Sequence, residues 1–517
     1  MEANQFLSLN QKESKEIFTP VKKKSIVPFL KEIKNNQLSS HQENTYNDFD
    51  YEGLIYRQLS QEGPAMAIGD IDGDGNEDVF IGGAKGQPGM IYQHQGNGRI
   101  KPIVQKALER DADYEDTAAA FFDVDGDGDQ DLIVGSGGNE VGKESTYRAR
   151  LYLNSGSGVF TTSATKLPSA FANISVIAPS DFDDDGDIDL FIGSRSIVGT
   201  YGVDPSHIFL INNGDGSFEN GTERVAYNLK NAGMITSAKW ADIDGDKKLD
   251  LITVSDWGSP KIFKNSGRRL IPFSSSLDSL SGWWNTVETA DLDMDGDLDM
   301  ILGNQGGNLH YKPTLDRPMK MWVNDFDNNG TIEQIVTQHQ EGKDYPHHQK
   351  KDLTNQMVTL KKQNLKASEY SKKTVEELFP KDIIENSIIK EARISESIIA
   401  INEGQGNFTI KKLPSRSQLS CICGISCKDV NNDGHLDLIM GGNNFEFKPQ
   451  YSRLDAAYGI VLLGDGAMNF EWQDYETSGF FIREEIKHIG LFKDKSGQQF
   501  LITAINEKKP KIFEFNE

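Results

Sequence analysis

The stretch DIDGDGNED, residues 70–78, decides the fold of this chain, because its pattern recurs six more times among 517 residues. The pattern is Asp-x-Asp/Asn-x-Asp/Asn-Gly-x-x-Asp/Glu, and one of the seven copies departs from it at the glycine. β-Rich segments such as DLIVGS, DLFIGS and DLIMGG overlap the ends of the copies. Seven copies in register with strand patterns exclude chance and make the repeat the organising feature of the chain.

The spacing of the carboxylates fits calcium, which takes six to eight oxygens at about 2.3–2.6 Å, so that a short loop must turn several of them inward. Glycine at the sixth position of six copies allows the tight turn that this needs. The predicted ligands are Asp70, Asp72, Asp74 and Asp78; Asp123, Asp125, Asp127 and Asp131; Asp181, Asp183, Asp185 and Asp189; Asp242, Asp244, Asp246 and Asp250; Asp291, Asp293, Asp295 and Asp299; Asp325, Asp327, Asn329 and Glu333; Asp429, Asn431, Asp433 and Asp437.

We expect about five to seven bound Ca²⁺ ions from these loops. The fourth loop is expected to bind most weakly, because Lys247 replaces the glycine and adds a positive charge. The sixth and seventh loops carry an asparagine at a ligand position, and the third loop has Asp184 and Asp187 besides its ligands. Affinity follows ligand charge, so the third loop is expected to bind more tightly than these two.

An EF-hand begins with a similar pattern but needs a glutamate at position twelve and helices on both sides. Position twelve is apolar here in six copies and threonine in the other: Ile81, Val134, Ile192, Thr253, Leu302, Val336 and Met440. Each loop therefore joins two strands.

A second signal follows most copies: a β-segment, a Gly/Asn turn and another β-segment, as in RLYLNSGSGVF and IFLINNGDGSF. Four strands per unit at this spacing predict an all-β fold, a β-propeller. The loops at Asp291 and Asp325 are 34 residues apart, too close for four strands, so both are assigned to one blade. With the loop-free C-terminal strands as the last blade, the count is seven, and eight is the alternative.

The loops resemble the FG-GAP/VCBS repeats of integrin α-like propellers. The stretches beginning YNDFDYEGLIYRQLS, SGWWNTVETADLD, VNDFDNNGTIEQIVT and SRLDAAYGIVLLG are similar to bacterial ASPIC/UnbV-type VCBS proteins, common in Bacteroidota. The likeness runs from about Tyr46 to the C-terminus. It implies the C-terminal propeller of a longer exported protein, associated with outer-membrane assemblies such as nutrient-uptake transporters. No leader and no upstream domain of that family occur in this sequence.

Residues 1–45 are polar and are predicted to be a linker, with the propeller at residues 46–517. Residues 53–60, GLIYRQLS, alternate like a strand and are expected to close the ring beside QQFLITAIN and PKIFEF. A helical insertion is predicted at about residues 339–394, with Asp352 as one N-cap and a capping box from Thr374 to Glu377. Leu353, Met357 and Leu360 share one helix face. Whether these two helices bind a partner or only decorate the propeller stays open.

The charge and apolar content limit the classes of function. A net charge of −24 argues against nucleic acid as a partner. No apolar run reaches the roughly 20 residues that a membrane span needs, and the N-terminus has no apolar export signal. Cys421, Cys423 and Cys427 are interpreted as small strand residues, since their spacing fits no zinc module.

No catalytic motif accompanies the carboxylates, and identical repeated clusters indicate structural ions. His347 and His348 are expected to face solvent. For Trp283 and Trp284 we favour core packing over a glycan-stacking platform. Three further residues, in the stretch that resembles the family, are candidates to line the propeller face: Arg453, Asp455 and Tyr458.

Two functions follow from this sequence. The first is a calcium-stabilised, non-enzymatic scaffold that binds a protein or a glycan outside the cytoplasm, where calcium is abundant enough for weak sites. The alternative is a calcium-dependent, glycan-active hydrolase or lyase with its site at the propeller axis. A concave axial pocket with polar groups other than the calcium ligands would distinguish the alternative from the scaffold.

Overall fold

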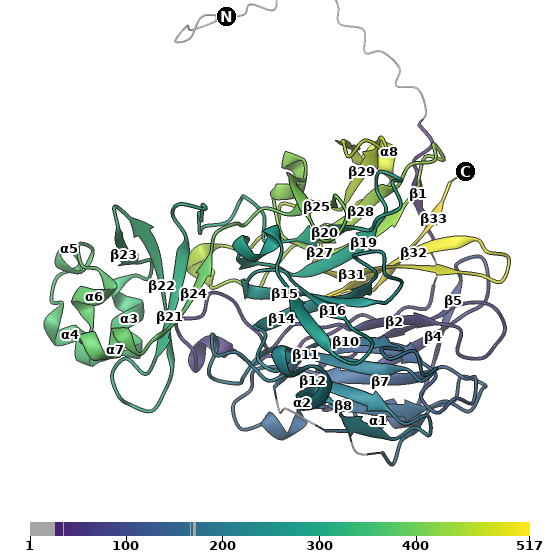
Figure 1. The fold of residues 1–517 in the computed structure, drawn as a ribbon, viewed down its shortest axis with the longest axis horizontal. Coiled ribbons are helices and arrows are strands. Elements are labelled where there is room, and N and C mark those ends of the chain that lie inside the picture. Colours follow the sequence, from purple (N-terminus) through teal and green to yellow (C-terminus); the bar gives the residue numbers. More distant parts are fainter. Residues whose placement is uncertain (1–25, 35, 166, 169–171, 517) are drawn as a thin grey trace, which may run out of the picture.

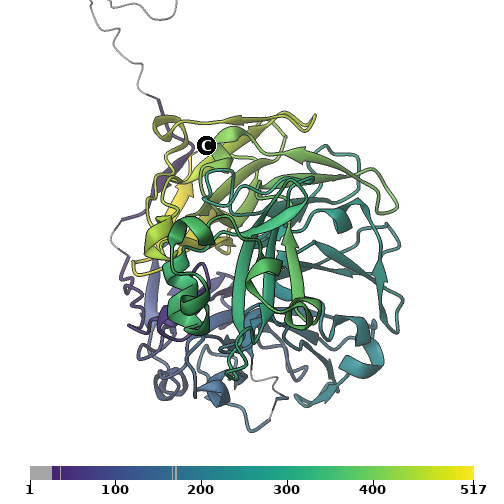
Figure 2. The same cartoon turned by 90° about the vertical axis from the view of Figure 1, so that its left-hand side faces the viewer.

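The computed structural model describes residues 26–34, 36–165, 167, 168 and 172–516. Seven of its antiparallel sheets form a closed ring, because the innermost strands contact one another in the order β2, β6, β10, β14, β19, β27, β31 and back to β2. An eighth sheet and five helices stand outside this ring (Figure 1). In Figure 2, which looks onto these helices, the blades lie around and behind them. The fold is therefore the predicted seven-bladed β-propeller.

Each blade of the ring has four strands running outward from the axis, and the bounds of these strands follow the repeat. The first three blades are β2 (Met66–Gly69), β3 (Asp78–Ile81), β4 (Met90–His94) and β5 (Ile100–Ile103), then helix α1 (Lys106–Arg110); β6 (Asp116–Phe122), β7 (Asp131–Ser136), β8 (Ala149–Leu153) and β9 (Thr161–Thr162); and β10 (Asn173–Ser180), β11 (Asp189–Ser196), β12 (Ile208–Asn212) and β13 (Phe218–Asn220), then α2 (Thr222–Val225).

The last four blades have the same order, with one extra strand in the fourth and an insertion in the fifth. They are β14 (Met234–Ala241), β15 (Asp250–Gly258), β16 (Lys261–Asn265) and β17 (Leu270–Phe273), with β18 (Gly282–Trp283) beside β15; β19 (Thr286–Ala290), β20 (Asp299–Gly303), β25 (Ile398–Asn402) and β26 (Phe408–Lys412); β27 (Ile422–Lys428), β28 (Asp437–Gly442), β29 (Ile460–Gly464) and β30 (Phe470–Trp472), then α8 (Tyr475–Ser478); and β31 (Ile486–Lys493), β32 (Gln499–Ile505), β33 (Lys511–Phe515) and β1 (Leu30–Glu32).

The N-terminal strand that closes the ring is β1, which pairs antiparallel with β33 as the outermost strand of the seventh blade. The prediction that residues 53–60 would do this is wrong, and so is the linker assignment for the described part of residues 1–45; residues 1–25 lie outside the described residues. A strand of three residues is too short to show a period in the sequence. Leu30 nevertheless anchors it, since its side chain is fully buried.

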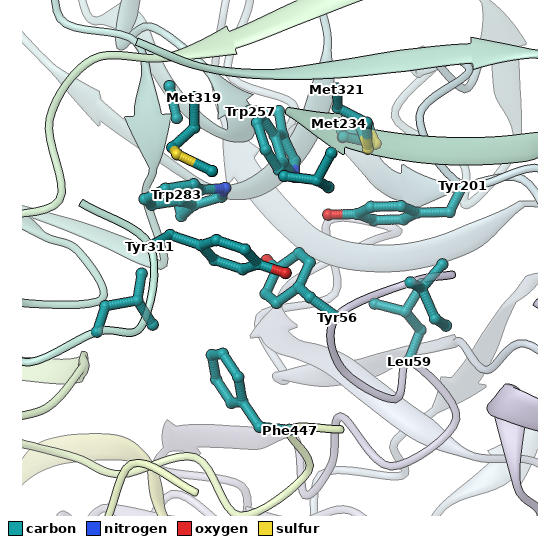
Figure 3. Close-up of a cluster of buried hydrophobic side chains, with 14 of the residues drawn as sticks. Tyr56, Leu59, Tyr201, Met234, Trp257, Trp283, Tyr311, Met319, Met321 and Phe447 are labelled. Atoms are coloured by element: carbon teal, nitrogen blue, oxygen red, sulfur yellow. The ribbon is translucent and has the colours of Figure 1, made fainter. Parts of the chain in front are cut away.

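Residues 53–60 instead close one mouth of the axial channel. Ile55, Tyr56 and Leu59 belong to a buried cluster with residues of several blades and of the insertion (Figure 3). The hydroxyl of Tyr56 lies 3.0 Å from both carboxylate oxygens of Asp256. The sequence of residues 53–60 resembles a strand because this segment, which plugs the channel, also packs many of its side chains in apolar surroundings. We refer to it as the plug.

The insertion lies between β20 and β25 and is larger than predicted. It holds a four-stranded sheet, β21 (Met319–Asn324), β22 (Glu333–Gln340), β23 (Lys343–Pro346) and β24 (Ile388–Ala392), and the helices α3 (Lys350–Gln356), α4 (Thr359–Gln363), α5 (Ala367–Tyr370), α6 (Val375–Leu378) and α7 (Lys381–Glu385). The loop at Asp325 joins β21 to β22, so it sits in this separate sheet and not in the ring blade of Asp291. In the part of the chain that the structure describes, no helix is long and apolar enough to cross a membrane.

The helices of the insertion are five short ones where two were expected. Leu353, Met357 and Leu360 are all buried in one cluster, as predicted, but they are spread over α3, the residue after it and α4. The N-cap of α3 is Gln349, not Asp352, which lies in the first turn. The capping box of Thr374 and Glu377 is present at the start of α6.

The aromatic and histidine side chains that were singled out are mostly buried. Trp283 and Trp284 are both buried, in two different clusters, which confirms core packing. The solvent-facing prediction is wrong for His348, which is buried and accepts a hydrogen bond from the Val336 N–H at 3.0 Å. His347 is partly buried and packs against the ring of Tyr311.

The three cysteines and the three residues proposed for the propeller face all lie in the sixth blade. Cys423 and Cys427 lie in the innermost strand β27, and Cys421 directly precedes it; all three are free thiols. Arg453 and Asp455 form an exposed ion pair at 2.9 Å in the loop between β28 and β29, and Tyr458 follows in the same loop.

Candidate metal centres

All seven acidic loops join two antiparallel strands, and the ninth residue of every loop is the first residue of the second strand. These ninth residues are Asp78, Asp131, Asp189, Asp250, Asp299, Glu333 and Asp437. Six loops connect the first and second strands of a ring blade, and the sixth loop does the same in the inserted sheet. Because first strands run the same way along the channel, the six ring loops lie at one end of the propeller.

The first aspartate of each loop holds the turn together. In the first loop the Asp70 carboxylate accepts hydrogen bonds from the N–H groups of Gly73, at 2.9 Å, and Gly75, at 3.0 Å. The bond to the sixth residue recurs in all the other loops at 2.8–3.1 Å. Each loop is thus folded around its first carboxylate.

The backbone of every loop turns left-handed at two positions. At position six the glycines have φ of 87–98°, and Lys247 adopts 71° there, so the expected strain at this copy is present. Its N–H still donates to Asp242 at 2.8 Å, and the turn keeps its shape. Position four is also left-handed in all copies, with non-glycine residues such as Asp184 (59°) and Met294 (64°). The sequence did not reveal this requirement, because residue identity at position four varies.

The ninth carboxylate is buried and ties the loop to the third strand of its blade. Asp78 accepts hydrogen bonds from the N–H of Ile71 at 3.2 Å and of His94 at 2.7 Å. Burial, together with the aspartates nearby, raises the pKa of Asp78 to about 7, and that of Asp189 likewise to about 7. Keeping these groups ionised costs free energy that a bound cation would offset.

Carboxylate oxygens converge in the ring loops. One oxygen from each of Asp70, Asp72 and Asp78 lies within 4.8 Å of the others, and the same holds for the first three acidic positions of the second to fifth loops. Oxygens on opposite sides of one calcium ion are about 5 Å apart, so these groups fit a single ion. Oxygen-only ligands in a flexible loop are the donor set that calcium prefers.

The fourth loop contains a competing cation that the sequence reading missed. Lys264, from β16, places its Nζ 2.6 Å from the Oδ2 of Asp244. In the first loop the corresponding neighbour is the neutral amide of Gln93, which contacts Asp72. The fourth loop is therefore disfavoured as a calcium site by Lys264 as well as by Lys247.

An asparagine at the end of the third strand links neighbouring loops. The backbone N–H of Asn212 donates to Asp189 of its own blade at 2.9 Å, and its side-chain amide donates to the carbonyl of Val124, in the preceding loop, at 2.9 Å. The same pair of bonds recurs at three further asparagines, Asn154, Asn265 and Asn402. The signal was visible as a recurring Asn before the Gly turn, but its role depends on contacts between blades.

The axis holds the polar cavity that the enzyme alternative requires, but it is small. Inner strands of six blades line a cavity of about 130 Å³ that also contains Arg57, Glu62, Arg195 and Lys487. Ligand pockets usually measure about 300–1,000 Å³. Arg195 lies 2.8 Å and Arg57 3.4 Å from Glu62. Although burial opposes them, these guanidinium groups lower the pKa of Glu62 to about 2, which makes it a poor proton donor.

The asparagine link predicts a specific loss of stability. Replacing Asn212 by alanine removes the donor to the carbonyls of Val124 and Ile188, and each unsatisfied buried group costs about 1–3 kcal/mol. The free energy of unfolding, measured in urea, should fall accordingly. Asn213→Ala, at the exposed neighbouring residue, should change it by less than about 0.5 kcal/mol. Equal losses in the two variants would contradict a role for the link.

Comparison with known proteins supports the repeat. The model of an FG-GAP-like repeat matches residues 70–134, 123–192 and 242–302. Sqt1 of Saccharomyces cerevisiae is similar in structure at 11% identity, over 90% of this chain and 100% of that one, with a TM-score of 0.43. The Dos1 propeller is similar at 10% identity, over 91% and 98%, with a TM-score of 0.41. These distant structural likenesses do not bear on function. The chain is a β-propeller that carries FG-GAP-like repeats.

Proposed function

We propose that this chain is a calcium-stabilised propeller that acts outside the cytoplasm as a non-enzymatic scaffold for another protein or a glycan. The observation that supports this most is the convergence of carboxylates in five of the six ring loops, which lie at one end of the molecule. A catalytic pair of carboxylates is needed once per site. Repeated clusters at blade corners match the requirement of structural ions instead.

The proposed compartment follows from the expected strength of the sites. Extracellular calcium modules commonly bind at about 10⁻⁴–10⁻³ M, which is useful only where calcium is abundant. We assign these partly exposed loops to that class. The resemblance to ASPIC/UnbV-type proteins of Bacteroidota extends the proposal to a surface complex of the outer membrane, a nutrient-uptake transporter being one candidate partner.

The insertion supplies the surface that we propose for docking. It projects from the end of the propeller opposite the ring loops (Figure 1). Large apolar side chains stand exposed on it, among them Val358 (67%), Leu365 (77%) and Ile389 (46%). A contiguous exposed apolar surface is typical of protein interfaces, and we propose that these side chains contribute to one. A partner bound there would leave the six ring loops untouched.

Counting the calcium ions tests the first half of this proposal. Equilibrium dialysis against calcium followed by elemental analysis should give about five to seven ions per chain. Asp183→Ala should remove about one ion, because it deletes a ligand from a complete loop. The matched control is Asp184→Gly, which removes the same charge at position four, where Gly73, Gly126 and Gly245 stand in other loops. One ion or none in the unaltered protein, or equal losses in both variants, would refute the sites.

Purification from the native host tests the scaffold. With calcium present, the chain should co-purify with a specific partner, and Ile389→Asp should weaken this recovery because it charges the exposed face of the insertion. Val104→Asp, at an exposed apolar residue outside the insertion, should not. The same preparations should show no turnover of glycans, esters or peptides. Turnover that Glu62→Gln abolishes and Asp183→Ala leaves intact would establish the enzyme alternative.

A further inference from the structure

A second group of side chains of types that can ligate a metal lies at the opposite end of the propeller from the ring loops. It consists of His41, Glu43, Glu115 and Glu485, and we refer to it as the His41 cluster. Its members come from the segment after β1, the residue before β6 and the residue before β31. All four side chains are buried: His41, Glu115 and Glu485 are at most 4% exposed, and the side chain of Glu43 is 1% exposed.

Four nitrogen and oxygen atoms of the His41 cluster have no hydrogen-bond partner. They are the Nε2 of His41, both carboxylate oxygens of Glu43 and the Oε1 of Glu115. Leaving a buried polar atom without a partner costs about 1–3 kcal/mol, and more if it is charged. A cluster of such atoms therefore indicates a bound group, and this distinguishes the cluster from an acidic surface patch.

Two of the orphaned atoms, the Nε2 of His41 and the Oε1 of Glu115, border one small space. A methyl group placed on Gly63 would lie 3.3 Å from the Oε1 of Glu115 and 3.4 Å from the Nε2 of His41, so both atoms point to one small space. Glu43 is also near the imidazole, with its Oε1 3.9 Å from the other ring nitrogen, Nδ1. Glu43 in turn lies close to Glu115 and within electrostatic reach of Glu485.

The hydrogen bonds behind the cluster orient the imidazole as a ligand. The Nδ1 of His41 is 2.9 Å from the side-chain oxygen of Asn506, which can only accept a hydrogen bond. Nδ1 therefore carries the proton, and the lone pair of Nε2 points into the cluster. The amide of Asn506 also donates to Glu485 at 3.4 Å. Metal-binding histidines are commonly fixed in this way by a second hydrogen bond.

The charges of the cluster do not balance. Three carboxylates face one ammonium group, that of Lys487, whose Nζ is 3.1 Å from the Oε1 of Glu485. Neighbouring acids have their own partners: Asp116 pairs with Arg150, and Glu140 with Lys85. With all three carboxylates ionised, an excess of two negative charges would remain in this buried place, and one divalent cation would neutralise it.

We propose that the His41 cluster binds one divalent transition-metal ion, with Zn²⁺ as the first candidate, through the Nε2 of His41 and the carboxylates of Glu43 and Glu115. Imidazole nitrogen suits Zn²⁺, whereas Ca²⁺ and Mg²⁺ take oxygen ligands. The site would join the segment after β1 to the second blade, at the seam where the ring closes. The competing account is a carboxyl pair, Glu43 and Glu115, that shares a proton.

The test is a zinc titration of the full chain, stripped of metal and then returned to excess calcium so that the ring loops are filled. Calorimetry with ZnCl₂ should find one Zn²⁺ per chain, and Zn²⁺ should raise the melting temperature further. His41→Gln and Glu43→Gln should each lower the affinity at least tenfold, with unchanged calcium content. His207→Gln, at a buried histidine bonded to backbone groups, is the matched control and should bind as the unaltered protein does.

A further variant separates the cluster from the nearby thiols, since the Sγ atoms of Cys421 and Cys423 lie 3.4 Å apart. Cys423→Ser should leave zinc binding intact. Three results would overturn the proposal: no zinc binding in excess calcium, loss of zinc binding in Cys423→Ser with retention in His41→Gln, or stabilisation by Glu43→Gln of a protein that binds no zinc. The last result would establish the shared proton. If His41→Gln does not fold, Glu43→Gln and Glu115→Gln decide the question.

Discussion

Repulsion among carboxylates is the constraint on which this structure depends. Five of the six ring loops bring three of their aspartates together, and the ninth residue of the loop is buried where its charge is unfavourable. If calcium binds only the folded chain, a concentration ten times the dissociation constant stabilises each site by about 1.4 kcal/mol. Six ring sites would then contribute about 8 kcal/mol, comparable with the net stability of about 5–15 kcal/mol of a typical protein. On this account calcium decides whether the propeller folds.

The loops do not act alone, because the blades are joined through them. Asn154, Asn212, Asn265 and Asn402 each connect the ninth carboxylate of one blade to the loop of the preceding blade. A cation that orders one loop therefore also fixes a contact of the next blade. The series ends where Gly464 occupies the corresponding place in the sixth blade. The rest of the ring is held by other contacts, chiefly the pairing of β1 with β33 in the seventh blade.

The two ends of the propeller carry different features, and the strand order explains why. Connections from first to second strands carry the acidic loops at one end, and the connections from second to third strands carry the long additions at the other. The largest addition is the insertion between β20 and β25, and residues 53–60 pack beneath it as a plug (Figure 3). A rigid ring with one calcium-bearing end and one elaborated end fits a scaffold that presents a docking surface.

The sequence predicted what is local and repeated, and it failed where distant segments meet. The nine-residue pattern located all seven loops and the strand after each one, because side-chain spacing and turn geometry are set within the pattern. The three residues of β1 have no recognisable period, and the plug at Tyr56 imitated a strand. Asp184 and Met294 adopt the left-handed backbone conformation that favours glycine, and their residue types did not predict it. The His41 cluster joins positions 41 and 485, which no local pattern connects.

The most direct measurement of the central claim is thermal unfolding with and without calcium. A chelator should lower the melting temperature by many degrees, and calcium added in excess should restore it, while magnesium at the same concentration should restore much less because it demands a tighter octahedral site. A melting curve that does not change in chelator would show that the seven loops are acidic turns held by their own hydrogen bonds, and it would contradict the account.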